Sequence, residues 1–528
     1  MGMKEKKRRN IVLIVSLAFL LLAAVVWGIQ ETIVSGEQRQ EQSDQGSVPE
    51  FQEFSDLSGK TVSMLTGAPF EELVKSHVPD VGEFTYYSSM ADMLLALKTG
   101  KTDAILNNNA VATLAINQNS DLALFPHNLK DGVFGYAFAK GNSRRDEWQE
   151  ALDRIPEEKL DELWEKWTGM DESVKHVPEQ DWPGKNGTVK AAMCDTLEPI
   201  SYVGENGELI GFDIELILLM AKELDVHVSF TGMELASVLS SVQSGKAQLG
   251  GGSIIATDER KELVDFVEYY PANFVLVVRA VADKSSSVSG VLSFLSDLRD
   301  SFYRTFIKEN RYTMVLSGLW LTILMSLSAG GAGFVLAYLL VLLRYKNLRV
   351  PNALISAYES LVAGIPAVVI LMVFYYIIFG KSSIPAVAVA IIGFSLIFGA
   401  RAHGAIWNAT SAVDDGQREA ALALGYTMDM SFKRVILPQA KRIYAPVLQS
   451  QFVSLLKETS VAGYIAVVEL TRAGDLIRSR TMEAFFPLIA IALIYFVLTR
   501  LLTKAADLAR KASERKKEAR MIKGVDRT

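Results

Sequence analysis

Apolar residues follow two different patterns along the chain, and these patterns divide it into two halves. In the second half, predominantly apolar segments reach the length of about 20 residues that a helix needs to cross a bilayer. They lie at 314–343, 353–379, 384–406, 444–468 and 484–502. Another twenty uncharged residues, Ile11 to Gln30, follow five basic residues at the N-terminus. We therefore expect an all-α membrane domain and about six transmembrane helices in total.

The N-terminal apolar run, within residues 1–30, has two interpretations. It is a membrane anchor, or it is a signal peptide that is removed. No small-x-small cleavage site follows the run, and no cysteine stands there for lipidation. This favours an anchor. Residues 31–54 are rich in Glu, Gln and Ser and contain too little apolar surface to fold, so we expect a tether.

From residue 55 to about 283, short apolar runs alternate with amphipathic stretches, which is typical of an α/β domain. Gly-Lys-Thr occurs at 59–61 and at 100–102. A phosphate-binding loop needs another glycine five positions before the Gly of Gly-Lys, and those positions hold Phe54 and Leu95. We therefore expect no ATP site in this chain.

Charge is distributed unevenly between the halves. Residues 31–312 hold 46 acidic and 25 basic side chains, a balance of −21, whereas the whole chain has a net charge of −6. Basic residues concentrate on the cytoplasmic side of membrane proteins, so this predicts an exported domain and a cytoplasmic C-terminus. The segment 469–483 is an exception, because Arg472, Arg478 and Arg480 fall on the predicted outer side. Neither half suggests nucleic acid.

Cysteine and metal chemistry contribute little. Cys194 is the single cysteine, which excludes an internal disulfide and a Cys-cluster metal site. We expect no metal and no cofactor.

A polar insert, "EAALALGYTMDMSFKRVILPQA" at 419–440, separates two of the apolar segments. Glu419, Ala420, Ala421, Gly425 and Pro438 match the E-A-A, G, I-x-L-P signature, except that Val435 stands where Ile is usual. The insert resembles that of permease subunits of ABC importers, in the polar amino acid uptake branch. This resemblance implies a coupling helix, within a loop at 407–443, that docks on a separate ATPase subunit. The alternative is a solvated hairpin.

Each letter of this signature has a physical role in such a helix. The two small alanines allow close approach, Gly425 permits a sharp turn, and Pro438 is expected to end the second segment.

The α/β half resembles extracytoplasmic solute-binding proteins of family 3. "GFDIELILLMAKEL" at 211–224 and "TDERKELVDF" at 257–266 carry the resemblance, which implies a two-lobed, type II periplasmic-binding-protein-like fold. Arg260 would clamp a ligand carboxylate, or form a surface ion pair. Gly67 would open a helix that faces an anion. The substrate-binding residues implied are Arg260, Thr257, Ser253, Gly252, Tyr202, Gly67 and Asn108.

Several positions depart from the amino acid pattern of these families. Asn108 replaces a carboxylate and would instead be a helix cap; Ile255 replaces a hydroxyl and would be core. Leu197 replaces a stacking aromatic, and Ala68 replaces a Thr. Tyr202 is either a ligand contact or lobe core. These losses weaken the assignment of the solute more than that of the fold.

The membrane half departs as well. Gly404 replaces a Glu, and Ala363 replaces an Arg near "GIP". Lys457 and Glu458 lie within an apolar segment and either line the translocation path or pair to hold helices together.

The two lobes occur in transposed order. Residues 55–178 resemble lobe two with its closing helix, and 179–283 resemble lobe one, before a linker at 284–312, a permease at 313–503 and a basic tail at 504–528. One circularly permuted domain is the expected arrangement, and two truncated domains are the alternative. Permutation predicts that residues 136–140 form the main covalent hinge, with lobe one leading to the membrane at 283.

These features predict a transport subunit, and not an enzyme, in a bacterial cell membrane. It would take up a small polar solute, an amino acid or a related compound, through a multi-pass permease. An ABC ATPase and a second permease half, in a homodimer, would be its partners. A ligand-gated receptor and a transmembrane sensor are the alternatives. The first would insert its pore between the lobes, and the second would need a cytoplasmic output domain.

Overall fold

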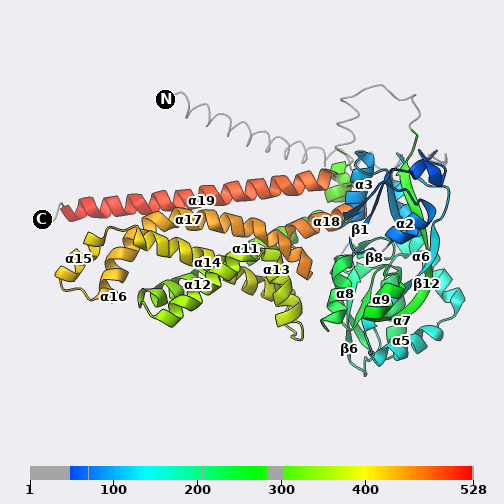
Figure 1. Ribbon diagram of the computed structural model, residues 1–528, viewed down its shortest axis with the longest axis horizontal. Helices are drawn as coiled ribbons and strands as arrows, with labels where there is room; N and C mark the ends of the chain where they lie inside the picture. The colour runs from blue at the N-terminus through cyan, green and yellow to red at the C-terminus, as the bar shows by residue number, and fades with distance from the viewer. Residues whose placement is uncertain are drawn as a thin grey trace.

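A computed structural model describes residues 48–281 except 69, 120, 170 and 205–206, then 299, 301–483 and 485–525, with backbone alone at 130–131, 485, 509 and 511–525. The N-terminal anchor or signal, most of the tether and most of the 284–312 linker lie outside the described residues. Figure 1 shows a sheet-containing body at one end of the long axis and helices along the rest. The expected α/β domain joined to a helical half is confirmed.

Lobe two comes first in the chain and consists of a parallel sheet with helices. After the short helix η1 (Phe54–Leu57), it contains β1 (Thr61–Leu65), α2 (Glu71–His77), β2 (Glu83–Tyr87), α3 (Met90–Lys98), β3 (Ala104–Asn108), α4 (Asn109–Gln118) and β4 (Leu122–Leu124). β1 pairs in parallel with both β2 and β3. The carboxyl ends of these strands therefore meet at one edge.

Lobe one follows and has the same kind of sheet. It contains β6 (Thr188–Cys194), α7 (Phe212–Glu223), β10 (His227–Met233), α8 (Leu235–Gln243), β11 (Leu249–Gly251) and α9 (Asp258–Leu263). β6 pairs in parallel with β10 and β11. A small separate sheet is formed by β7 (Thr196–Leu197), β8 (Ser201–Val203) and β9 (Leu209–Ile210).

Two long strands join the lobes. β5 (Lys130–Ala139) pairs with β11 of lobe one, and β12 (Val264–Arg279) pairs with β3 and β4 of lobe two. They also pair with each other in antiparallel register, with an irregularity between Glu268 and Tyr270. The resulting order, β10-β6-β11-β5-β12-β3-β1-β2 with β4 on β12, makes one nine-stranded sheet.

The path of β12 differs from the expectation that residues 136–140 form the main covalent hinge and that lobe one leads to the membrane. After leaving lobe one, β12 carries the chain back into lobe two, where its run Val275–Val278 is buried against β3. The backbone N–H and C=O groups of this run need neighbouring strands, and β3 and β4 of lobe two pair with it. The chain therefore leaves the domain at Val281 beside lobe two, where the Val281 amide donates to the Val48 carbonyl at 2.8 Å.

The sheet and the core join the halves into one domain. A single buried cluster contains Val62 and Leu106 from lobe two together with Val189 and Leu249 from lobe one. The closing helices α5 (Arg144–Asp153) and α6 (Glu157–Thr168) bury Trp148 and Trp167 in this cluster, and η2 (Glu172–Val174) follows them. Both halves therefore share one sheet and one buried cluster, and their description as one permuted domain stays a prediction.

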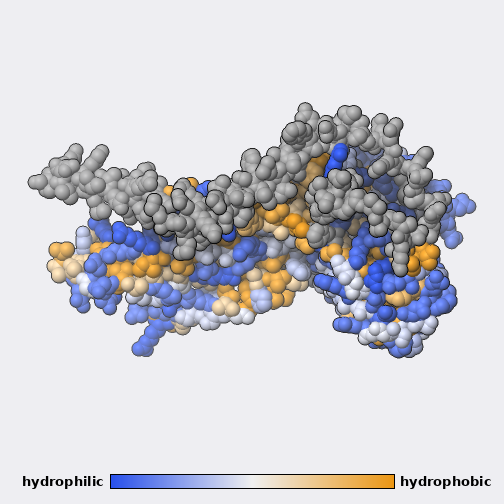
Figure 2. All heavy atoms as spheres, turned by 90° about the horizontal axis from the view of Figure 1, so that it is seen from above, coloured by the Kyte–Doolittle hydropathy of each residue, from blue (hydrophilic) through white to orange (hydrophobic). Residues whose placement is uncertain are grey.

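The helical half begins with short helices and continues with long ones. Its elements are η3 (Tyr303–Ile307), η4 (Lys308–Asn310), α11 (Tyr312–Tyr345), α12 (Arg349–Gly364), α13 (Ala367–Met372), η5 (Val373–Ile378), α14 (Ala386–Ser411), α15 (Asp415–Ala423), α16 (Met428–Ser431), η6 (Phe432–Ile436), α17 (Leu437–Glu458), η7 (Thr459–Ile465), α18 (Leu470–Thr481) and α19 (Phe485–Val525). Figure 2 shows hydrophobic residues gathered along this half.

Three helices of the described chain are long and apolar enough to cross a membrane: α11, α14 and Phe486–Leu508 of α19. A fourth candidate is the pair Arg349–Gly364 and Ala367–Ile378, if these helices, bent by 110° at their junction, form one span. The expected span at 444–468 does not meet this test. α17 ends at Glu458, its first turns carry Lys441 and Arg442, and a 3₁₀ helix follows it.

Small residues let α11 approach α14. A Cβ added at Gly333 would lie 2.6 Å from the Ser395 carbonyl oxygen, so only glycine fits there. Lipid tails are as apolar as the helix side chains, so the hydrophobic effect does not drive helices together in a membrane. Close backbone packing of this kind does so instead.

Candidate solute cleft, docking helix and coupling segment

The loop after β11 lies at the carboxyl edge of lobe one, where ligands of open α/β sheets bind. The amides of Gly252 and Ser253 donate to one oxygen of Asp213, at 2.8 and 3.2 Å, and the Tyr269 hydroxyl donates to the other at 2.6 Å. Burial raises the pKa of Asp213 to about 6, against these hydrogen bonds. Asp213 lies within the family motif at 211–224, but it was not predicted as a site residue. It fixes the shape of this loop.

Arg260 is buried where the two lobes meet, with 8% of its surface exposed. Thr257 caps its helix, and the guanidinium donates to the carbonyls of Ile255 at 3.0 Å and Gly67 at 2.7 Å. Burial lowers the pKa of Arg260 to about 10. The alternative of a surface ion pair is therefore wrong, because the side chain is buried and bonds to carbonyls of both lobes.

Gly67 has φ +88°, a conformation that favours glycine. Its role differs from the expectation, because α2 begins at Glu71 and not directly after Gly67. The group that Gly67 presents to the cleft is a carbonyl, which accepts a hydrogen bond from Arg260.

Asn108 is a helix cap, as its alternative interpretation predicted, and its role in solute binding stays a prediction. Its Oδ1 accepts from the Val111 amide at 3.0 Å and so caps α4, while its Nδ2 donates to Ser253 Oγ at 3.2 Å across the cleft. Ile255 is buried in the core, as the alternative for that position predicted.

The structure thus brings together most residues predicted to bind solute. Tyr202 is the exception: it is buried in the core, where its ring lies edge-on to Trp167 with centroids 6.3 Å apart. The remaining residues line both sides of the interface between the lobes. Their roles in solute binding stay predictions.

α18 joins the helical half to the binding domain through three arginines. Arg472 pairs with Asp195 of lobe one, and Arg478 pairs with Asp92 of lobe two. Arg480 donates to the Val203 carbonyl at 2.8 Å and pairs with Glu309 at 2.8 Å. The sequence marked these three arginines in one way: they fall on the predicted outer side, whereas basic residues usually lie on the cytoplasmic side. We call α18 the docking helix.

A second contact lies beside the docking helix. Lys246, just after α8 in lobe one, donates to the carbonyls of Phe379 at 2.9 Å and Ser382 at 3.3 Å. Its ammonium also lies 4.5 Å from the centre of the Tyr375 ring. The binding domain therefore rests on two separate parts of the helical half.

The coupling segment, α15 to η6, lies at the far end of the molecule from the binding domain (Figure 1). Glu419 and Ala420 are exposed, whereas Ala421 is buried. Gly425 has φ +83° and makes the turn after α15, and Leu424 beside it is 81% exposed. A side chain at Gly425 would be strained.

Pro438 occupies a different place from the one predicted. It lies in the first turn of the long helix α17, so it begins a helix and does not end one. Proline fits this position because the first amides of a helix have no intrahelical partner.

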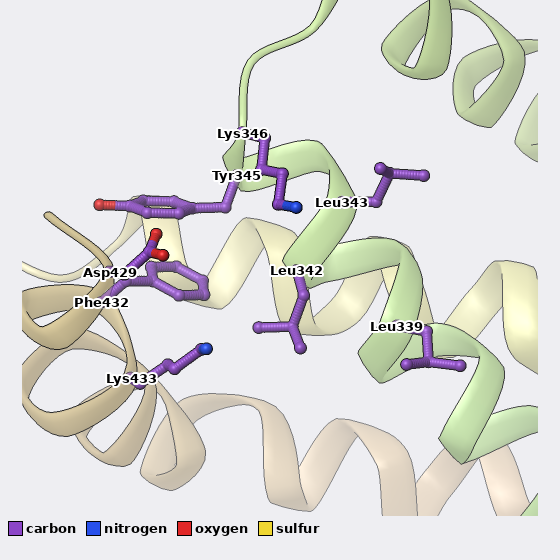
Figure 3. Close-up of a pocket in the computed structure, with 8 residues that line it drawn as sticks. All are labelled: Leu339, Leu342, Leu343, Tyr345, Lys346, Asp429, Phe432 and Lys433. Atoms are coloured by element: carbon purple, nitrogen blue, oxygen red, sulfur yellow. The ribbon is translucent and has the colours of Figure 1, made fainter.

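The end of α11 packs on the coupling segment. Tyr345 stacks on Phe432 with ring centroids 4.0 Å apart, and its hydroxyl donates to the Met428 carbonyl at 3.0 Å. A cavity of about 310 Å³ lies beside this stack, and Figure 3 shows Lys346 and Lys433 on either side of it. A shift of the coupling segment would therefore displace the end of α11 or break these contacts.

Among the polar groups of the described helical core, two clusters hold an ion pair between long helices. Glu458 pairs with Arg401 of α14 at 2.6 Å and not with its neighbour Lys457, which is exposed. Glu458 thus joins α17 to α14 through a residue that was not predicted, and a role in translocation stays a prediction.

The second cluster was missed by the sequence analysis. Glu359 pairs with Arg344 at 3.1 Å and contacts His403 Nδ1 at 2.7 Å, joining α11, α12 and α14. A Cβ added at Gly404 would lie 3.3 Å from the Glu359 carboxylate. Glycine at 404 leaves room for this carboxylate, which explains that departure from the family pattern.

Comparisons with known proteins agree with both halves of the fold. The family model for bacterial extracellular solute-binding proteins, family 3, matches residues 189–512, more than half of the chain. The helical half is 32% identical over 205 residues to the probable amino-acid permease protein YxeN of Bacillus subtilis, covering 38% of this chain and 92% of the relative. It is 31% identical over 194 residues to the probable glutamine ABC transporter permease protein GlnM of the same organism, covering 36% and 88%.

Among solved structures, a chain from the crystal structure of an amino acid ABC transporter with histidines is 28% identical, with a TM-score of 0.36, covering 43% of this chain and 99% of that chain. These relatives are transport and binding proteins and not enzymes. The chain therefore belongs to the family 3 bacterial extracellular solute-binding proteins, and its helical half belongs to the amino-acid ABC transporter permeases.

Proposed function

We propose that this chain is the membrane subunit of an ATP-driven importer that captures an amino acid, or a related small polar solute, in its own binding domain. The observation that carries the proposal is the arrangement of the docking helix and the coupling segment at opposite ends of one helical half. Relatives of that half are named as amino-acid, glutamine and cystine permeases. Solute would enter at the first end, and energy would be supplied at the second.

The surface of the coupling segment supports a protein partner. Leu422, Leu424 and Met428 are exposed apolar side chains on a segment of only a few turns. Apolar groups gathered in this way mark interaction sites. A separate ABC ATPase subunit on the cytoplasmic side is the partner proposed, and the binding domain would then be extracytoplasmic.

The solute class follows from the cleft. Arg260 is a buried guanidinium, and a carboxylate is the group that it binds best, through two parallel hydrogen bonds. Asn108 in place of an acid removes the charge that would attract an ammonium, so related carboxylates without an α-amino group belong to the candidates. Thr257, Ser253, Gly252 and Gly67 would supply the remaining polar contacts.

A second permease half is part of the proposal, because one set of these helices does not enclose a path. α11 exposes large apolar side chains, among them Leu316, Trp320 and Leu327. Such a surface suits lipid or a second copy of the chain. A homodimer would carry two binding domains.

Transport by the chain and its ATPase subunit in proteoliposomes tests this function. Uptake of labelled amino acids and solute-stimulated ATP hydrolysis would both be measured. Glu419→Lys and Gly425→Asp should abolish both, because they alter the coupling segment, while solute binding by the external domain persists. Glu157→Lys, the same charge change on exposed α6, is the matched control. Unchanged uptake in both coupling variants would refute the assignment.

A further inference from the structure

The cavity of about 310 Å³ between the end of α11 and the coupling segment has one apolar wall and two charged edges. Leu339, Leu342 and Leu343 of α11 form the wall, because residues three and four apart lie on one face of a helix. Lys346 and Lys433 stand at the edges, and Figure 3 shows both side chains extending toward Leu342. The cavity therefore suits a ligand that is apolar at one end and negatively charged at the other.

The leucine wall is exposed at the surface of the helical half. Leu339 is 57% exposed and Leu343 is 37% exposed. They belong to α11, which is long and apolar enough to cross a membrane. Lipid tails are as apolar as leucine, so exposed leucines of a spanning helix contact acyl chains. The wall is therefore accessible to lipid from the side.

The two lysines are placed to meet a lipid headgroup. Lys346 directly follows α11, and Lys433 lies in η6 of the coupling segment. A lysine at the end of a membrane helix extends its ammonium group to the level of the headgroups. Both side chains are exposed, and within the described residues neither ammonium group has an ion pair or a hydrogen bond. Both are therefore free to bind a phosphate.

The charge of the lining favours an anionic headgroup. Asp429 also lines the cavity and lies beside the stack of Tyr345 on Phe432. Two lysines against this one carboxylate leave the lining with a charge of +1. A zwitterionic headgroup would place its own ammonium group near the lysines, whereas an anionic headgroup brings the phosphate without that repulsion.

We propose that this cavity binds one anionic phospholipid, with the phosphate between Lys346 and Lys433 and an acyl chain along the leucine wall. Basic pockets beside membrane helices bind anionic headgroups in this way. The lipid joins α11 to the coupling segment, because each contributes one of the two lysines. The site requires neither solute nor an ATPase subunit, so it goes beyond the proposed function.

Native mass spectrometry of the full chain in detergent micelles tests the site. Dioleoylphosphatidylglycerol and dioleoylphosphatidylcholine are titrated separately, and bound lipid is counted per chain. The parent should bind one phosphatidylglycerol more tightly than any phosphatidylcholine. Lys346→Gln combined with Lys433→Gln should lower the affinity for phosphatidylglycerol about tenfold, because two attractive charges are removed. The two Lys→Arg changes together should retain it, since a guanidinium also binds phosphate.

Lys441→Gln combined with Arg442→Gln is the matched control. Both residues are exposed in the first turns of α17 and lie outside the cavity, so the change in charge is the same. This variant should bind phosphatidylglycerol as the parent does. An equal loss of affinity in both Gln variants would overturn the site, because general basic charge would then account for binding.

Two further results would overturn the proposal. Displacement of phosphatidylglycerol by excess inorganic phosphate would mean that the lysines bind phosphate without a lipid chain. A parent that binds both lipids equally, with fewer dimers in the Lys346→Gln and Lys433→Gln variant, would mean that a second copy covers this face. Retention of phosphatidylglycerol against phosphate, with its loss in that variant alone, supports the lipid site.

Discussion

The two ends of the helical half differ in how their charged and apolar groups are satisfied. At the docking helix, buried arginines already have acidic partners within the same chain. At the coupling segment, apolar Leu424 and charged Glu419 are exposed to solvent. The comparison indicates that the chain supplies one interface for itself and leaves the other for a separate protein.

The strongest loss of function is expected at the coupling segment, the end whose apolar groups are exposed. Leu424→Asp should abolish solute-stimulated ATP hydrolysis by the assembled transporter, because a charge would be buried where an apolar contact is needed. The thermal stability of the isolated chain should not change, since Leu424 contacts solvent. Val174→Asp, on the exposed surface of the binding domain, is the control. Normal hydrolysis in Leu424→Asp would mean that this end is not an interface.

The cleft beside the docking helix gives the next effect. Arg260→Ala should weaken binding of a carboxylate solute by about 2 to 5 kcal/mol, as when one partner of a buried charge pair is removed. Arg260→Lys should recover only part, because an ammonium lacks the planar fork. Titration calorimetry on the full chain measures this, with exposed Arg154→Ala as control. If neither substitution changes the affinity for the solute, then another residue binds the solute carboxylate.

At the docking helix, the free energy of unfolding is expected to depend on pH through one buried carboxyl group. Burial raises the pKa of Glu198, a lobe-one residue between β7 and β8, from 4.5 to about 7, against the nearby positive charge of Arg480. The folded state therefore holds a proton that the unfolded state has lost, and stability falls as pH rises from about 4.5 to 7. Glu198→Gln removes this penalty. It should stabilise the binding domain by about 3 kcal/mol at pH 8 and by almost nothing at pH 4.5.

The full chain is unfolded in urea, and hydrogen exchange monitors the unfolding of the binding domain. This measures the difference in stability. Glu223→Gln, an exposed carboxylate of α7, should show no such trend. An advantage of Glu198→Gln that is equal at both pH values would show that Glu198 is not protonated in the folded protein.

The smallest effect concerns the contact between α11 and the coupling segment. Tyr345→Phe keeps the stack on Phe432 but removes the hydroxyl bond to Met428, worth about 1 kcal/mol. We expect a few-fold loss of solute-stimulated hydrolysis, and a larger loss for Tyr345→Ala. Tyr312→Phe at the other end of α11 is the control. Equal activity in Tyr345→Ala and the parent would exclude this contact as a route of coupling.

Local patterns in the sequence predicted the class of each half but not how the halves meet. The alternation of short apolar runs and the family motifs identified the two-lobed domain and the permease. The partners of Arg472 and Arg478 could not be predicted, because Asp195 and Asp92 lie 277 and 386 positions away. Periodicity describes only neighbours within a helix or strand.

Two predicted elements differ from the structure, each for its own reason. Proline ends many helices but also begins them, and Pro438 does the latter. The apolar segment at 444–468 has enough length, but its charged residues and the 3₁₀ helix after Glu458 keep it from forming one long apolar helix. Composition alone did not separate these possibilities.

The strand pairing at Val48 and Val281 has a mechanical consequence. The chain enters and leaves the binding domain side by side, joined by Glu50–Arg279 backbone and side-chain bonds of 2.8 Å each. A pull between these ends breaks that short ladder one bond at a time, and it reaches β12 only at its last residue, Arg279. A force that arrives through the chain on either side of this pairing is therefore borne first by these few bonds, before it reaches the sheet that joins the two lobes.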